Sequence, residues 1–223
     1  MNIGKIKMMA VVCCFWIAYN SYAQENYFGS IQINKEITDS PKWSTSVVVH
    51  WKQFYSETGW NRIGVDGAVK RKLNNWSILG GLVTNLTFDE TIENNTEIRP
   101  WLAIGLHNIV YKKFSLDQSL KLEWRNLFFS GNITNITTTR TRYKIKPNYE
   151  FKKNWSAFTS YEWYFLPNTD IGNRFVSSRE WRLGVTKKYS KFSAQLQYVR
   201  ERFFNEWQLN QLNGNTLSLT FLF

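Results

Sequence analysis

The sequence predicts an all-β protein, an antiparallel transmembrane β-barrel of about ten strands, with twelve strands as the alternative. An aromatic residue followed by Ser opens successive strand-like runs at intervals of 33, 38, 41 and 37 residues, each the length of one long hairpin. Most runs alternate apolar and polar residues, and the last one ends the chain on Phe223. The recurring pairs are Trp43-Ser44, Trp76-Ser77, Phe114-Ser115, Trp155-Ser156 and Phe192-Ser193.

The alternation gives each run one apolar face and one polar face, as a barrel wall between lipid and water requires. In the run 119–125, Leu and Trp alternate with Ser, Lys, Glu and Arg. The run 140–151 alternates aromatic and aliphatic residues with Arg, Lys and Glu. Because so many unpaired charges on the hidden face of a soluble sandwich cost too much free energy, these runs favour a wet lumen.

The individual strands follow from the recurring pairs and the turns between them. Short connections such as Lys72-Leu73-Asn74-Asn75 are expected to face the periplasm, and the longer ones, rich in Asn, Thr and acids, to be extracellular loops. The expected outgoing strands are 43–55, 76–88, 114–129, 155–166 and 192–203, and the returning strands are 60–72, 96–112, 137–152, 174–188 and 213–223.

One further segment, residues 27–37, also alternates like a strand and would make eleven. Bacterial single-chain barrels have even strand counts. The segment is therefore expected to fold into the lumen, to lie along the rim, or to be an extra strand with a partner in 204–212.

The N-terminus resembles a secretory leader. Lys5 and Lys7 precede an apolar run that ends near Ala18, and Ser21-Tyr22-Ala23 supplies small residues for a peptidase. The expected organisation is a signal peptide over 1–23, an N-terminal segment over 24–42 and the barrel over 43–223. Both cysteines lie inside the leader, so the mature chain is expected to have none.

The net charge is +11 over the whole chain and +9 after removal of the leader, which carries two Lys and no acid. The basic residues are spread along the strands without a basic tail, and export argues against nucleic acid as a partner. The charge is therefore assigned to the lumen and the rim.

The inward charges of neighbouring strands form the first candidate site. Acids and bases at matched heights on strands about 4.8 Å apart are expected to pair as a ladder, such as Glu123–Arg142–Glu162–Arg182. One interpretation is that this ladder packs and stabilises a narrow lumen; the other is a selectivity zone that passes or binds small anions. The candidate residues are Lys121, Glu123, Arg125, Arg140, Arg142, Lys144, Glu162, Glu180 and Arg182.

Two further sets concern the membrane. Aromatic rings that open successive strands are expected to form a periplasmic-side girdle at the lipid headgroups, and the alternating final strand to act as a signal for the barrel-assembly machinery. The girdle residues are Trp43, Trp76, Phe114, Trp155 and Phe192, and the assembly signal comprises Leu217, Leu219, Phe221 and Phe223.

Several segments resemble a family of bacterial outer-membrane β-barrels known only as a domain of unknown function. The resemblance rests on the runs 28–35, 42–44, 123–125, 142–147 and 162–164 and extends over about residues 28–223. It implies the fold and the outer membrane as location, and it implies no activity or catalytic residue.

The expected function is therefore that of an integral outer-membrane barrel, structural or a small pore with a narrow, basic lumen, in contact with outer-membrane lipid. No cofactor or metal site is expected, since nothing adjacent to His50 or His107 supplies a ligand set. Two alternatives stay open: a barrel enzyme acting on lipid, for which Ser46 and His50 share a face, and a soluble all-β periplasmic or secreted binding protein.

Overall fold

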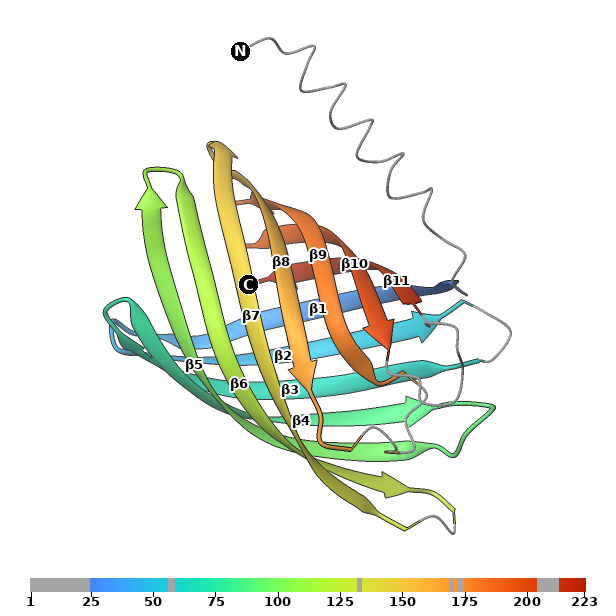
Figure 1. The fold of residues 1–223 in the computed structure, drawn as a ribbon. Coiled ribbons are helices and arrows are strands. Elements are labelled where there is room, and N and C mark those ends of the chain that lie inside the picture. The colour runs from blue at the N-terminus through green and yellow to red at the C-terminus, as the bar shows by residue number, and fades with distance from the viewer. Residues whose placement is uncertain (1–24, 56–58, 132–133, 169–170, 172–174, 204–212) are drawn as a thin grey trace.

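The chain folds into a closed β-barrel of strongly tilted strands (Figure 1). The computed structural model describes residues 25–55, 59–131, 134–168, 171, 175–203 and 213–223. Residues 1–24, which include the expected leader, and the proposed partner segment 204–212 lie outside the described residues. The described part of the chain holds no helix that is long and apolar enough to cross a membrane.

Eleven strands form the described wall. Ten of them match the expected strands closely; the largest difference is at one strand start, expected at residue 174 and found at Ser177. The strands are β1 (Glu25–Asp39), β2 (Trp43–Phe54), β3 (Asn61–Leu73), β4 (Trp76–Phe88), β5 (Asn95–Tyr111), β6 (Phe114–Phe129), β7 (Ile136–Lys152), β8 (Trp155–Phe165), β9 (Ser177–Lys188), β10 (Ser193–Phe203) and β11 (Asn213–Leu222).

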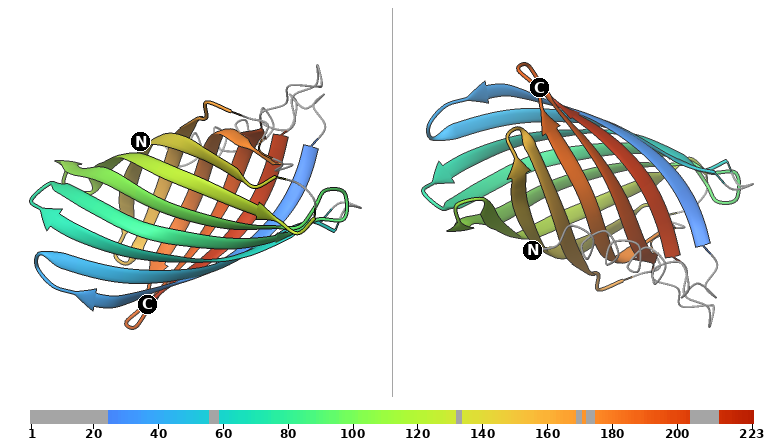
Figure 2. Two further views of the ribbon diagram at one scale, coloured as in Figure 1. Left: turned by 90° about the horizontal axis from the view of Figure 1, so that it is seen from below. Right: turned by 90° about the horizontal axis from the view of Figure 1, so that it is seen from above.

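The eleventh strand is β1, which contains the segment 27–37. It lies in the wall between β2 and β11, as both views in Figure 2 show, and not in the lumen or along the rim. Strands that alternate in direction leave the first and last parallel when their number is odd, so β1 pairs with β11 in parallel. The structure thus departs from a wholly antiparallel barrel at this one pair.

The C-terminal residue, Phe223, extends the β1–β11 pair, which is called the closing pair below. The backbone N–H of Phe223 donates to the carbonyl of Asn34 at 2.8 Å, and the N–H of Glu36 donates to the carbonyl of Phe223 at 2.9 Å. The terminal residue therefore hydrogen-bonds to β1 even though it lies beyond the last residue of β11.

The outer face of the barrel is apolar across many strands. Alternate residues are exposed there, while their neighbours along each strand point inward and are buried or half-buried. The exposed set includes Ile31, Ile33, Val47, Val49, Ile63, Val65, Leu82, Leu86, Leu102, Ile104, Leu120, Leu122, Leu183, Val185, Leu196 and Leu217. Such a band suits contact with lipid chains.

One end of the barrel has tight turns, and this is called the turn end below; the opposite end is the loop end. Asn74 and Asn154 take positive φ angles of 52° and 66° in the β3–β4 and β7–β8 turns. Asn tolerates this left-handed region better than most residues because its short side chain bonds locally. The β3–β4 and β7–β8 turns therefore place an Asn at their left-handed position.

The closing pair can be tested by disulfide formation. Ile31 and Leu219 are register partners on the outer face, with Cα atoms expected about 5 Å apart. Ile31→Cys combined with Leu219→Cys is expected to oxidise to an intramolecular disulfide, detected as faster migration of the unreduced, denatured protein.

The matched control is Ile31→Cys with Leu196→Cys. Leu196 pairs with Leu219 one strand further from β1, which puts the two Cα atoms at roughly 10 Å, beyond the reach of a disulfide. Crosslinking of the control pair alone, or of neither pair, would mean that β1 does not adjoin β11.

Candidate functional site

Two buried glutamates of β5 and β6 anchor the first group of interior charges. Glu97 accepts hydrogen bonds from Arg99 and Arg125, and the Asn85 side-chain amide donates to it at 3.2 Å. Glu123 is wholly buried among bases: Arg140 at 2.6 Å, Arg142 at 3.2 Å, Lys121 at 3.3 Å and Arg99 at 3.7 Å. Each carboxylate is therefore shared by several cations.

A second group lies on β8, β9 and β10, where the register aligns three acids side by side. Glu162 is opposite Glu180, and Glu180 is opposite Glu201. Like charges directly opposite one another destabilise a sheet. Each acid is neutralised by its own base: Glu162 by Arg142 at 2.7 Å, Glu180 by Arg182, and Glu201 by Lys52.

Arg142 and Tyr164 connect the two groups. Arg142 bonds Glu123 of the first group and Glu162 of the second. The Tyr164 hydroxyl accepts from Arg142 at 3.4 Å and donates to Glu180 at 3.2 Å. The guanidinium carbons of Arg140 and Arg142 lie 5.0 and 4.8 Å from the centroid of the Tyr164 ring, within cation–π range.

The predicted ladder is therefore present in two of its three steps. The pairs Glu123–Arg142 and Arg142–Glu162 are formed, whereas Arg182 pairs with Glu180 of its own strand. Matched height accounts for Glu123 and Arg140, which are register partners and lie 2.6 Å apart. It fails from β8 to β10, where the register places acid opposite acid, and Arg142 and Arg182 instead reach an acid two residues along. Lys144 is opposite Glu162 in the register, and no ion pair within 4.0 Å joins it to another described residue.

Four interior residues of the two groups were not predicted: Glu97, Arg99, Glu201 and Lys52. The run 97–103 carries the signal, since Glu97, Arg99 and Trp101 alternate with exposed Ile98 and Leu102. The pair Lys52–Glu201 had no sequence signal, because β2 and β10 become neighbours across the lumen only when β1 and β11 close the wall.

A cavity of about 250 Å³, called the mid-lumen cavity below, lies among these charges. Its lining includes both carboxylates Asp66 and Glu201, the imidazole of His50, and the ring of Tyr164. His50 Nε2 is 2.9 Å from the side-chain oxygen of Asn85. Seven basic side chains also line it: Lys52, Arg62, Arg99, Lys121, Arg125, Arg140 and Arg142.

A buried aromatic cluster, called the cap below, lies at the loop end of the lumen next to this cavity. Phe175, which precedes β9, also lines the cavity, and its ring centroid lies 5.0–5.4 Å from those of the other four members. Gly214 of β11 leaves room for the cap, since a Cβ there would lie 2.7 Å from the Phe203 ring. The cap consists of Phe28, Phe54, Trp60, Phe175 and Phe203.

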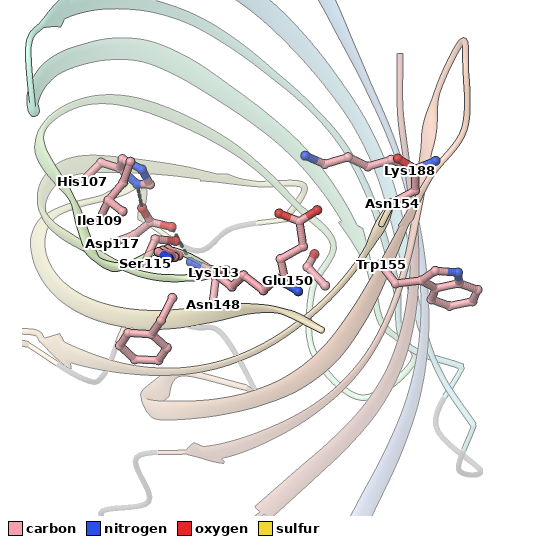
Figure 3. Close-up of a pocket in the computed structure, with 13 residues that line it drawn as sticks. His107, Ile109, Lys113, Ser115, Asp117, Asn148, Glu150, Asn154, Trp155 and Lys188 are labelled. Carbon is pink, nitrogen blue, oxygen red and sulfur yellow. Dashed lines mark hydrogen bonds and ion pairs between the residues drawn. The ribbon is translucent and has the colours of Figure 1, made fainter. Parts of the chain in front are cut away.

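A second hollow of about 370 Å³ opens at the turn end (Figure 3). Asp117 lies between two partners, His107 Nδ1 at 2.5 Å and the donating amide of Asn148 at 2.8 Å. Lys188 and Glu150 reach into the hollow, while Trp155 points away from it (Figure 3). The groups here are of both signs, and the histidine side chain is 57% exposed.

The structure places the predicted girdle residues at one end of the barrel. Trp43, Trp76, Phe114 and Trp155 each open a strand, and Phe192 directly precedes β10. The four assembly-signal residues point outward along β11 and its end, while Thr216, Ser218 and Thr220 are buried inside. The Phe223 ring stacks on that of Phe192 at 5.7 Å, so the last residue joins this ring of aromatics.

A family model described as "Protein of unknown function (DUF2490)" matches residues 25–213, which is most of the chain. The chain belongs to the DUF2490 family. This agrees with the resemblance seen in the sequence, and the match begins at the first residue of β1. No curated protein matches the sequence significantly.

Two solved structures resemble this DUF2490 barrel. The NanC porin matches with a TM-score of 0.53 and 10% identity, over 84% of this chain and 93% of the porin chain. The TodX monoaromatic hydrocarbon channel has a TM-score of 0.43 and 10% identity, over 77% of this chain and 64% of its own. The NanC likeness shows that the DUF2490 chain has a porin-like barrel fold.

The interior pairing predicts an effect on stability. Glu123→Ala in the DUF2490 barrel leaves four bases around an empty position and is expected to lower the free energy of unfolding by about 3 kcal/mol. The measurement is urea unfolding of the refolded protein in lipid vesicles.

Two further variants separate the loss of the buried charge from the loss of a glutamate in general and from the loss of side-chain volume. Glu90→Ala removes an exposed glutamate and is expected to change the free energy of unfolding by less than about 0.5 kcal/mol. Glu123→Gln keeps the shape and removes the charge, so its loss should approach that of Glu123→Ala. Equal stability of the Glu90 and Glu123 alanine variants would refute the pairing.

Proposed function

We propose that the protein is an integral outer-membrane barrel whose narrow, basic lumen passes small anions. The observation that carries this proposal is the mid-lumen cavity, whose seven basic side chains outnumber the five acids that line it or pair with them, Asp66, Glu97, Glu123, Glu162 and Glu201. Ion selectivity in pores follows the sign of the charges that line the constriction. The excess of bases therefore favours anions over cations.

The outer-membrane location is supported by the outer face. Its exposed aliphatic residues extend over most strands, and a closed wall leaves no unpaired backbone groups towards lipid. The porin-like fold and the leader-like residues 1–23 agree with export to that membrane. A soluble binding protein has no use for such an apolar outer band.

The narrowness of the lumen is supported by the side chains that fill it. The linked charge groups extend inward from β5 to β10, and the cap narrows the loop end with five rings that are at most 7% exposed. Barrels of this size fill much of their interior with side chains. Conductance is therefore expected to be small.

No specific observation favours the alternative of a lipid hydrolase. His50 lies in the lumen, where its Nε2 is hydrogen-bonded to Asn85, and not at the lipid-facing rim. We propose a role without catalysis and without a cofactor. A lipid-hydrolysis assay of the purified barrel and its His50→Ala variant tests this directly.

Conductance tests the proposed pore. The refolded mature protein in a planar bilayer is expected to give small discrete steps whose reversal potential in a KCl gradient indicates chloride preference. Lys121→Gln removes a cavity charge while Glu123 keeps three other basic neighbours, so the preference should fall. Cation preference of the wild type, or inserted barrels without steps, would overturn the conduction proposal.

The matched control is Lys35→Gln, which removes an exposed lysine on the outer side of β1. Its reversal potential should equal that of the wild type. An equal shift in both variants would indicate a general surface-charge effect and would contradict a role for the cavity.

The final strand is proposed as the signal for the barrel-assembly machinery. Phe223→Ala removes the ring that stacks on Phe192 and ends the outward apolar face of β11. The amount of heat-modifiable barrel in the outer-membrane fraction is expected to fall several-fold. Tyr111→Ala, which removes another exposed aromatic ring at the turn end, is the control and should leave the amount unchanged.

A further inference from the structure

Arg62 of β3 lines the mid-lumen cavity without an acidic partner. Its Nε donates to the Thr87 hydroxyl at 2.9 Å, and its guanidinium carbon lies 5.1 Å from the Trp60 ring centroid. Within the described residues, no carboxylate oxygen comes within 4.0 Å of its nitrogens. A guanidinium inside the barrel without a directly bonded acid costs free energy, which a bound anion would recover.

Arg125 of β6 lines the same cavity and is likewise incompletely bonded. The residue is 1% exposed, and its Nε is bonded to Glu97. Its Nη1 is buried and has no acceptor among the described residues. Buried donors in folded proteins nearly always have an acceptor, so this nitrogen calls for one beyond the described residues, such as a water or an anion.

The volume and the charge of the cavity restrict what that group is. About 250 Å³ corresponds to roughly eight water molecules at ~30 Å³ each, enough for one small anion with part of its hydration shell. Asp66 and Glu201 are the acidic lining groups, and Glu201 is already paired with Lys52. With Glu97, Glu123 and Glu162 counted as partners of the lining bases, seven bases still exceed five acids by two, so a doubly charged anion fits better than a monovalent one.

We propose that this cavity is a binding site for one compact, multiply charged oxyanion of the sulfate or phosphate class, with Arg62 and Arg125 as its main donors. Guanidinium groups suit such ligands because their planar N–H forks match pairs of oxyanion oxygens. The cap covers the loop side of the site through Phe175. The site rests on the proposed basic lumen, and it makes the lumen a place of specific binding and not only of passage.

The test is calorimetric titration of the refolded mature barrel in detergent with sodium sulfate, and separately with inorganic phosphate, against sodium chloride at equal ionic strength. The expected result is saturable binding of one oxyanion per barrel, absent with chloride. Arg62→Gln should weaken it at least tenfold, and Arg62→Lys, which keeps the charge and loses the planar fork, should weaken it less.

The matched control is Arg71→Gln. Arg71 is exposed at the turn end, where its guanidinium lies 5.4 Å from the Trp43 ring centroid, and its loss should leave binding unchanged. Heat-modifiable mobility shows that each variant is folded. If Arg62→Gln does not fold, the comparison of Arg62→Lys with the wild type decides.

The outcomes separate this site from the proposed conduction. Anion-selective conductance without saturable sulfate or phosphate binding would overturn the site and leave the pore. Arg62-dependent binding in a barrel that does not conduct would support the site and overturn conduction. Binding that is unchanged in both Arg62 variants would also overturn the site.

Discussion

The closing contact between β1 and β11 is the constraint on which the rest of this structure depends. A strand edge facing lipid would leave a row of backbone N–H and C=O groups unpaired, and each unsatisfied group costs several kcal/mol there. The parallel register from Glu25–Asn213 to Asn34–Leu222 satisfies them, and the backbone bonds of Phe223 to Asn34 and Glu36 continue the pairing. On the inner face, the Lys52–Glu201 ion pair spans the same closing pair. It joins β2 and β10, which are the outer neighbours of β1 and β11 in the wall.

Closure also decides what the inner face must contain. With aliphatic side chains directed outward, every second residue points into a confined lumen, where charges are tolerated only in pairs or with water. The register then places Glu162, Glu180 and Glu201 side by side, which is unfavourable unless each acid has its own base. Arg142 satisfies one of them and at the same time joins the β8–β10 acids to the Glu123 group.

The sequence was sufficient for the local features and insufficient for those that depend on closure. An aromatic-Ser pair at Trp43 or Trp76 is a local signal, and so are the Asn turns, which explains why most strand limits were predicted to within a residue or two. Whether β1 belongs to the wall depends on a partner nearly 190 residues away, and an even strand count was expected from other bacterial barrels. The cap joins residues from five separate places in the chain, so periodicity along any one strand does not reveal it.

The same reasoning explains why the interior charges were predicted as a set but not as pairs. Alternation identifies Arg140, Arg142 and Lys144 as inward-facing, whereas the pairing depends on the height of each charged group after a long side chain has extended. Arg142 reaches acids on both neighbouring strands, while Lys144, directly opposite Glu162, pairs with none of the described acids. Of the seven bases that line the mid-lumen cavity, six also pair with a described carboxylate, and Arg62 is the one without such an ion pair. The set of charges around this cavity thus follows from how the wall acids are neutralised, and it requires no separate cluster of bases in the sequence.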